Sequence, residues 1–166
     1  SRRGGAVHAS AETVVQLSFG TSILRNWAGG VGGGLAMVQD SRLEVGDGVV
    51  IQENEVMHSG VDCSTPPCGG GGISIGDTAT ARLYPGALVT RNRAATGGGI
   101  LLSGTATAVV GGEVSWNEAQ DGGGVAAVDA SSVLVDGAWC GHNTAEKQGG
   151  CVFHGGSAVQ FRGQSR

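Results

Sequence analysis

Short runs of alternating apolar and polar residues fill most of this chain, and each run follows a cluster of glycines. After Gly99, for example, the apolar residues are Ile100, Leu102, Ala106, Ala108, Val110 and Val114. The stretches after Gly72 and Gly124 repeat this order. Such alternation of small and β-branched residues is typical of short β-strands with one buried face. No window has a helical period, and good helix formers are sparse. The pattern therefore predicts an all-β chain.

The glycine clusters form a repeat. Six clusters, which end at Gly5, Gly34, Gly72, Gly99, Gly124 and Gly150, each lead into an apolar residue. Their last glycines lie 25 to 29 residues apart, except for one interval of 38 residues. A unit of about 26 residues with about three strands cannot bury its own apolar face, so neighbouring units must stack. We therefore expect a right-handed parallel β-helix (a β-solenoid) of about six coils, spaced about 4.8 Å apart.

Asparagines recur in step with the glycines, at Asn26, Asn54, Asn92, Asn117 and Asn143. Stacked at one turn of each coil, their amides can hydrogen-bond along the solenoid and satisfy backbone groups that the turn removes from the sheets. We therefore expect an asparagine ladder. The alternative is that each asparagine only tolerates a left-handed turn conformation.

The long interval indicates an insertion. Its extra residues fall within 55–69, so we expect a looped-out segment there, inside one β-helix domain that covers residues 1–166. Gly4 opens directly into a repeat, and residues 155–166 stop part-way through one, without a cap of the kind that isolated solenoids carry. We expect either a segment of a longer β-helix or a unit that stacks end to end on other copies.

The chain has four cysteines, namely Cys63, Cys68, Cys140 and Cys151. An even number in a β-rich chain fits an oxidising compartment, although four cysteines allow three pairings. Cys63 and Cys68 bracket a turn-rich hexapeptide, which favours a local disulfide over free thiols. Cys140 and Cys151 are aligned with the inward positions of Val114 and Ile100, where a disulfide and two buried free thiols are equally open.

Charged residues beside the asparagines change sign from coil to coil. The residues that precede three asparagines are Arg25, Glu53 and Arg91, and those that follow three asparagines are Glu55, Arg93 and Glu118. Stacking would turn each set into a surface ladder of opposite charges, worth about 0.2–1 kcal/mol per step. Coincidence on a solvated face is the alternative. Three tryptophans near the same turns, Trp27, Trp116 and Trp139, are expected to pack as caps over the solenoid rather than to stack on sugars.

Composition narrows the classes of function. Glycine supplies 33 of the 166 residues, and proline supplies three. The chain has a net charge of −4, and 40% of its residues are hydrophobic. The absence of a Gly-X-Y period excludes collagen, and the apolar content disfavours disorder. No basic patch predicts a nucleic-acid partner, and no apolar run reaches the roughly 18 residues of a membrane helix.

Polysaccharide lyases and glycosidases are the catalytic alternative, because many β-helices are enzymes of these classes. They need paired carboxylates, or carboxylates with calcium and a basic residue, whereas the Asp and Glu residues here are scattered among the coils. Gly141-His142 is similar to part of a polygalacturonase motif but has no pair of aspartates with it. We therefore assign no catalytic, cofactor-binding or metal-binding residues and no cofactor.

Two four-residue motifs alternate along the chain. Gly4-Gly5-Ala6-Val7 nearly matches GGAI, and Gly97-Gly98-Gly99-Ile100 is a glycine variant of it. Val114-Ser115-Trp116-Asn117 and its equivalents match FxxN without the phenylalanine. The motifs resemble the repeats of the polymorphic outer membrane proteins, autotransporter-type surface adhesins of chlamydiae. The resemblance implies a pectin-lyase-like β-helix, an extracellular or cell-surface location and no shared active site.

The expected function is therefore structural or adhesive, and non-catalytic. It includes a filament or surface-scaffold subunit that stacks end to end, with a host or cell-surface glycan or protein as partner. A carbohydrate-binding or polysaccharide-processing β-helix is the second candidate.

Overall fold

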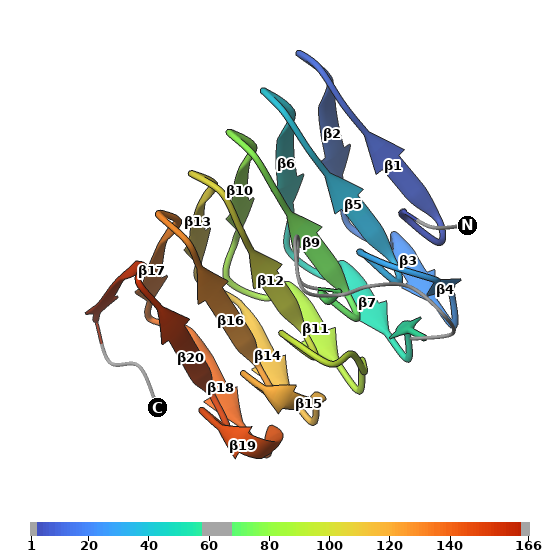
Figure 1. Ribbon diagram of the computed structural model, residues 1–166. Helices are drawn as coiled ribbons and strands as arrows, with labels where there is room; N and C mark the ends of the chain where they lie inside the picture. The colour runs from blue at the N-terminus through green and yellow to red at the C-terminus, as the bar shows by residue number, and fades with distance from the viewer. Residues whose placement is uncertain (1–2, 58–67, 164–166) are drawn as a thin grey trace.

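The computed structural model describes residues 3–57 and 68–163, which form a parallel β-solenoid (Figure 1). Successive strands of the chain enter three different sheets, and every pairing is parallel and joins one coil to the next. The predicted all-β solenoid with about three strands per coil is therefore confirmed. Its length is about five turns, because the last coil contributes strands to two sheets only.

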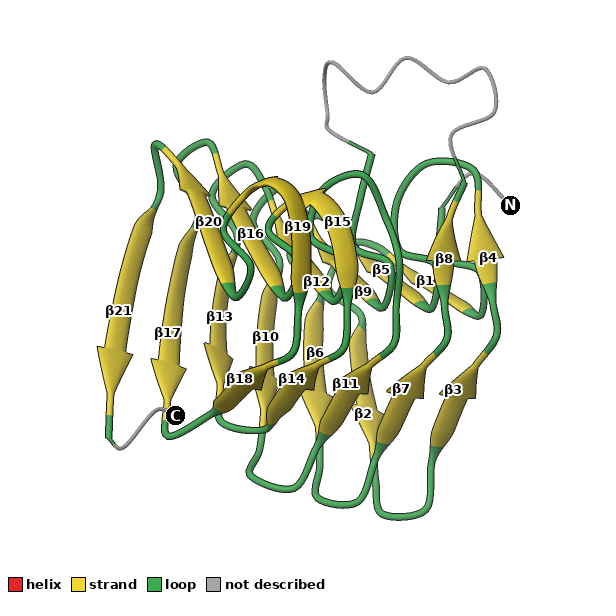
Figure 2. Ribbon diagram, turned by 90° about the horizontal axis from the view of Figure 1, so that it is seen from below, coloured by secondary structure: helices red, strands yellow, loops and turns green. Residues whose placement is uncertain are grey.

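Each sheet collects equivalent strands, seen as parallel arrows in Figure 2. Sheet 1 contains β1 (Val7–Ala9), β5 (Leu35–Met37), β9 (Ile73–Ile75), β12 (Ile100–Leu102), β16 (Val125–Val128) and β20 (Val152–Gly155). Sheet 2 contains β2 (Val14–Leu17), β6 (Arg42–Val45), β10 (Thr80–Leu83), β13 (Thr107–Val110), β17 (Ser132–Asp136) and β21 (Ala158–Arg162). Sheet 3 contains β3 (Ser22–Leu24), β7 (Val50–Gln52), β11 (Leu88–Thr90), β14 (Glu113–Ser115) and β18 (Trp139–Gly141). The short strands after the asparagines are β4 (Trp27–Ala28), β8 (Glu55–Val56), β15 (Glu118–Asp121) and β19 (Thr144–Gln148).

The glycine clusters are the points where one coil lies closest to the next. Gly97 has a φ of +60°, a conformation that glycine adopts without the steric cost of a Cβ. A Cβ on Gly98 would lie 2.6 Å from the carbonyl oxygen of Gly123 and 2.5 Å from that of Glu118. These neighbours are rigid backbone, so no side chain fits. Glycine therefore recurs once per coil because the stacking distance demands it.

The interior is a stack of aliphatic side chains contributed by all three sheets. In sheet 2, Leu43, Ala81 and Ala108 lie in register on successive coils and are buried. Burial of this kind is the main source of stability, at about 25 cal/mol per Å². The predicted alternation fails in sheet 1, where Leu101 and Ala126 are fully buried although they lie on the face of the sheet opposite the core, which their neighbours on either side line. Strands buried on both faces read as unbroken apolar runs.

The bounds predicted for the insertion are too wide. Glu55 and Val56 form β8, and Gly69 pairs with Val31 and Thr96 in neighbouring coils. Residues 58–67 lie outside the described ranges. Cys68 is disulfide-bonded, while Cys63, its predicted partner, lies among the residues that are not described.

A disulfide joins Cys140 in β18 to Cys151, just before β20. Cys140 continues the inward column of Val114, as expected. The predicted alignment of Cys151 with Ile100 is wrong by one residue, because Ile100 and Val152 both pair with Val125. Cys151 instead takes the position that the last glycine holds in each of the four preceding clusters. The disulfide therefore joins the column of inward-facing residues to the column of glycines.

Candidate functional site

The five asparagines form one continuous column along the corner between sheet 3 and the short strands. In each of the four steps, the backbone N–H and the side-chain Nδ2 of one asparagine both donate to Oδ1 of the asparagine in the next coil, at 2.9–3.0 Å. The second Nδ2 hydrogen of Asn92 donates to the carbonyl of Ile51, and that of Asn117 donates to Val89. The three middle asparagines are about 1% exposed. Each middle amide is therefore fully bonded, as burial requires.

The residue before each asparagine forms a second column, which we call the corner column. Its members are Arg25, Glu53, Arg91, Trp116 and His142. All five have a φ between +53° and +56°, in the left-handed region. This conformation costs a residue with a Cβ roughly 1–2 kcal/mol. It turns the chain sharply out of sheet 3 and directs the following asparagine inward, so the asparagine column rests on a strained corner.

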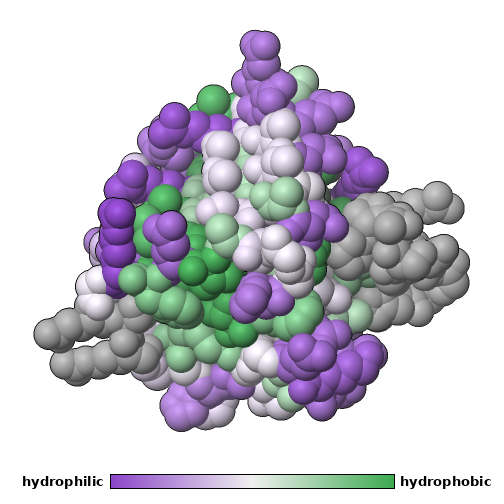
Figure 3. All heavy atoms as spheres, turned by 60° about the vertical axis from the view of Figure 1, so that its left-hand side comes forward, coloured by the Kyte–Doolittle hydropathy of each residue, from purple (hydrophilic) through white to green (hydrophobic). Residues whose placement is uncertain are grey.

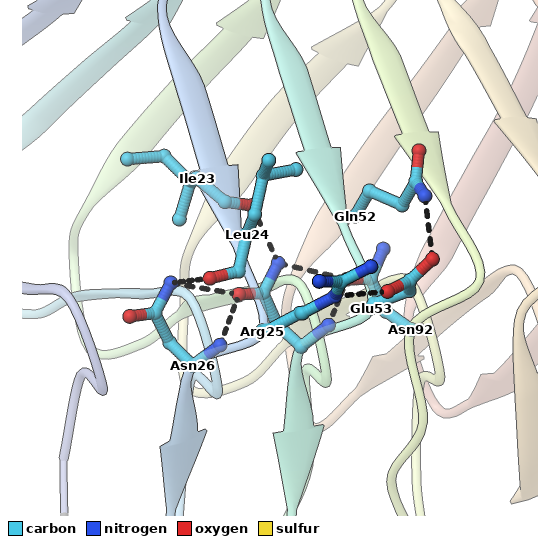
Figure 4. A network of polar contacts seen from close by, with 8 residues as sticks. Ile23, Leu24, Arg25, Asn26, Gln52, Glu53 and Asn92 are labelled. Carbon is cyan, nitrogen blue, oxygen red and sulfur yellow. Dashed lines mark hydrogen bonds and ion pairs between the residues drawn. The ribbon is translucent and has the colours of Figure 1, made fainter.

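Charge pairing occupies the first part of the corner column (Figure 4). The Nε of Arg25 donates to a carboxylate oxygen of Glu53 at 2.7 Å, and Gln52 donates to the other oxygen. The Arg25 hydrogen bond, followed by that of Gln52, holds the pKa of Glu53 below its ordinary value. Arg91, one coil further on, acts in the same direction through its charge.

The charged residues after the asparagines also stack in the predicted order. Glu55, Arg93 and Glu118 are joined by backbone bridges between successive coils. Their side chains form one ion pair, Arg93–Glu118, at 3.6 Å, with both side chains about half exposed or more. A hollow of about 260 Å³ lies along these residues and is bordered by Glu146. Exposed pairs of this kind contribute little to stability.

Aromatic side chains occupy the last part of the corner. The imidazole of His142 stacks on the indole of Trp116, with ring centroids 4.2 Å apart and an angle of 18° between the planes. Trp139 meets His142 edge-on, at 5.8 Å and 72°. We call these three residues the aromatic patch. Trp27 is 56% exposed and Trp116 is 53% exposed, so the prediction that the tryptophans cap the solenoid is wrong for these two. Trp139 is 38% exposed, and its indole lies against Gly141.

The patch was missed from the sequence, although the signal was present. Trp116 and His142 hold the same position relative to their asparagines as Arg25, Glu53 and Arg91. Extending the charge pattern by two coils would have placed the two rings on top of each other.

A further polar column, at the turn from sheet 1 to sheet 2, was also missed. The backbone N–H of Ala11 donates to Oε1 of Gln39, that of Gln39 to Oδ2 of Asp77, and that of Gly104 to Oδ2 of Asp129, at 2.9–3.3 Å. Gln39, Asp77 and Asp129 each follow the last glycine of a cluster by five residues. That constant offset was the available signal.

The outer face of sheet 2 carries another hollow, of about 340 Å³. Its lining includes two arginines, three hydroxyl side chains and two aliphatic side chains, namely Arg42, Arg82, Thr80, Thr107, Ser132, Val109 and Leu134. Arg42 pairs with Glu44 on the same strand, and Arg82 lies 5.0 Å above the ring of Tyr84. The hollow is thus lined by both apolar and polar side chains.

The described residues show no group of three or more His, Cys, Asp or Glu side chains able to hold a metal ion. They also include no helix of the length and hydropathy of a membrane span. A comparison of the chain with protein-family models, with curated proteins and with solved structures gives no match.

Proposed function

We propose that this chain is an extracellular, non-catalytic β-solenoid with a structural or adhesive role. The asparagine column is the observation that carries the proposal. The polar side chains that the repeat places in equivalent positions bond to the next coil and stabilise the stack. They do not converge on a common point, as the groups of an active site do. The result is a rigid frame that presents varied side chains at regular intervals.

The disulfides support an extracellular location. Cys140–Cys151 and the bonded Cys68 belong to a class of bond that persists in oxidising compartments and is rare in the cytosol. The GGAI-like and FxxN-like motifs fit the same location, because they resemble those of the polymorphic outer membrane proteins. An adhesin of that type, with a cell-surface glycan or protein as its partner, is the specific form that we propose.

The test is adhesion by the whole chain. Beads coated with the oxidised protein should be retained on surfaces coated with cell-surface glycans or matrix proteins, under flow that removes beads coated with an unrelated β-solenoid. Retention equal to that of the unrelated solenoid on every surface would contradict the adhesive role.

Stacking of coils between copies is a further part of the proposal. At the β20–β21 end, Val152 and Val159 are only partly covered and Phe161 is 59% exposed. Figure 3, which brings this end forward, shows apolar side chains gathered within a polar margin. Such an edge suits another coil of the same kind, from a second copy or from further sequence. Sedimentation over a range of concentrations tests stacking on a second copy, since end-to-end stacking predicts a mass that rises with concentration.

The second candidate function is binding or processing of a polysaccharide in the hollow of sheet 2. It is favoured by the arginine and hydroxyl side chains that line that hollow. A screen of acidic polysaccharides for chain shortening distinguishes the two, since turnover that is lost in Arg82→Ala would replace the non-catalytic function.

A further inference from the structure

Trp139 lies on the outer face of sheet 3, with its indole against Gly141. A Cβ on Gly141 would be 2.7 Å from Cζ2 and 2.9 Å from Cε2 of the Trp139 indole, so the ring covers Gly141. The neighbouring coils carry Ser115 and Thr90 at the position of Gly141. The glycine therefore leaves the room that the indole needs to lie along the strand.

The stacked pair beside it does not by itself offset the strain of its backbone. Trp116 and His142 both have a φ of +56°, which costs roughly 1–2 kcal/mol for each residue. A stacked aromatic pair contributes about 0.5–1.5 kcal/mol, which offsets at most the strain of one residue. The same conformation recurs at every member of the corner column, so the strain belongs to the corner of each coil. What the stacked pair adds is an exposed aromatic surface, and such surfaces mark interaction sites.

A polar group adjoins the patch. Glu113 in β14 pairs directly with Trp139 in β18 and extends from the same face. The hydroxyl of Ser115 lies 2.6 Å from Oε1 of Glu113. Within the part of the chain that the structure describes, no hydrogen bond reaches Oε2 of Glu113, so that oxygen can accept one from a ligand.

A flat indole beside a carboxylate matches a ligand with an apolar face and a hydroxyl-bearing edge. A pyranose ring has this form, because its axial C–H bonds face the negative π-surface while its hydroxyls lie at the rim. A protein partner is disfavoured, since three rings fall far short of the roughly 1,000 Å² that a stable interface needs. An acidic sugar is disfavoured by the negative charge of Glu113.

We propose that the aromatic patch and Glu113 form a binding site for a neutral glycan, with one pyranose ring on Trp139 and a sugar hydroxyl donating to Glu113. The neutral glycan is then the partner of the adhesive surface proposed above, and this proposal rests on that adhesive function.

The test is calorimetric titration of the oxidised full chain with cellohexaose, mannohexaose and chitohexaose. At least one should bind saturably, and Trp139→Ala should weaken that binding about tenfold or more, as removal of an aromatic hot spot does. Trp27→Ala is the matched control, because Trp27 is 56% exposed but lies on β4, in the first coil. Its binding should equal that of the unsubstituted chain.

Gly141→Ala tests the orientation of the ring. The added methyl group must displace the indole while every aromatic residue is retained, so we expect affinity to fall here as well. Far-ultraviolet circular dichroism identifies any variant that fails to fold, and Trp139→Phe, which keeps a smaller ring, should retain part of the affinity.

The site would be overturned by no binding of any of the three sugars at millimolar concentration, or by unchanged binding in both Trp139→Ala and Gly141→Ala. A dimer of the unsubstituted chain that Trp139→Ala abolishes would also overturn it, by making the patch a contact between copies. Any of these three results, obtained while bead adhesion is intact, rejects the glycan site alone. Sugar binding without bead adhesion rejects the adhesive function and keeps the site.

Discussion

The asparagine column and the corner column occupy adjacent residues of every coil, yet they differ in composition and environment. The asparagine column is one residue type throughout, and its middle members are buried. The corner column holds three charged residues and two aromatic residues, and their backbones share the same left-handed conformation. The backbone therefore restricts which conformation both columns adopt. Burial restricts the type of side chain, and it does so in the asparagine column only. The frame is fixed by what the asparagines bond to, and the corner column is free to carry recognition.

Asn92→Ala, in the buried column, should have the largest effect on stability. The substitution removes the oxygen that accepts from the N–H and Nδ2 of Asn54, and it leaves the carbonyl of Ile51 without its donor. Each buried polar group without a partner costs about 1–3 kcal/mol, so the free energy of unfolding should fall by roughly 3–5 kcal/mol. Urea unfolding followed by circular dichroism measures the change.

Asn26→Ala is the control for that variant. Asn26 is only partly buried, and in the described residues its Oδ1 accepts no hydrogen bond from another coil. The free energy of unfolding should fall by only a small fraction of the decrease expected for Asn92→Ala. Equal losses at the two positions would mean that the column is not held by its buried amides.

Removal of the Cys140–Cys151 disulfide should have the next largest effect. The bridge lies at the last described asparagine, where Nδ2 of Asn143 contacts the sulfur of Cys140 at 3.4 Å. Cys140→Val with Cys151→Gly restores the residue types of the preceding coil, and should lower stability by about 2–3 kcal/mol through the lost loop constraint. Hydrogen exchange should increase first in β18 and β20. Uniform exchange along all coils would show that the bridge does not act locally.

The repeat and the positions of the asparagines are readable from the sequence because the stacking distance admits only glycine at Gly98 and buried amides demand a regular partner. The exposed rings are not readable in the same way. Trp116 and His142 stack through a backbone register that only the fold reveals, and Gly141 acquires its meaning from a ring two residues away. Cys151 was misplaced because a one-residue shift changes little in the apolar pattern but changes which column a residue joins.

Arg91→Asn, in the corner column, should have a smaller effect on stability, and of the opposite sign. Arg91 has a φ of +53°, and asparagine adopts this conformation at lower cost than arginine. We expect the chain to become more stable by about 0.5–1 kcal/mol, measured by urea unfolding. Thr80→Asn, which places the same residue in the extended strand β10, should give no gain. A loss at Arg91 would show that its side chain, rather than its backbone, governs this position.

Acidification should reveal the weakest interaction of the corner column, the pair of Arg25 and Glu53. Its hydrogen bonds hold the pKa of Glu53 below the ordinary value of 4.5, so the folded state favours the ionised carboxylate. The stabilisation is therefore present above about pH 4.5 and is lost as the pH falls through the lowered pKa. Unfolding midpoints of the unsubstituted chain and of Glu53→Gln should differ slightly at neutral pH and converge in acid. The difference should also shrink with added salt, because both side chains are exposed. A Glu53 carboxyl that titrates at or above 4.5 by NMR would show that the corner charges merely coincide in space.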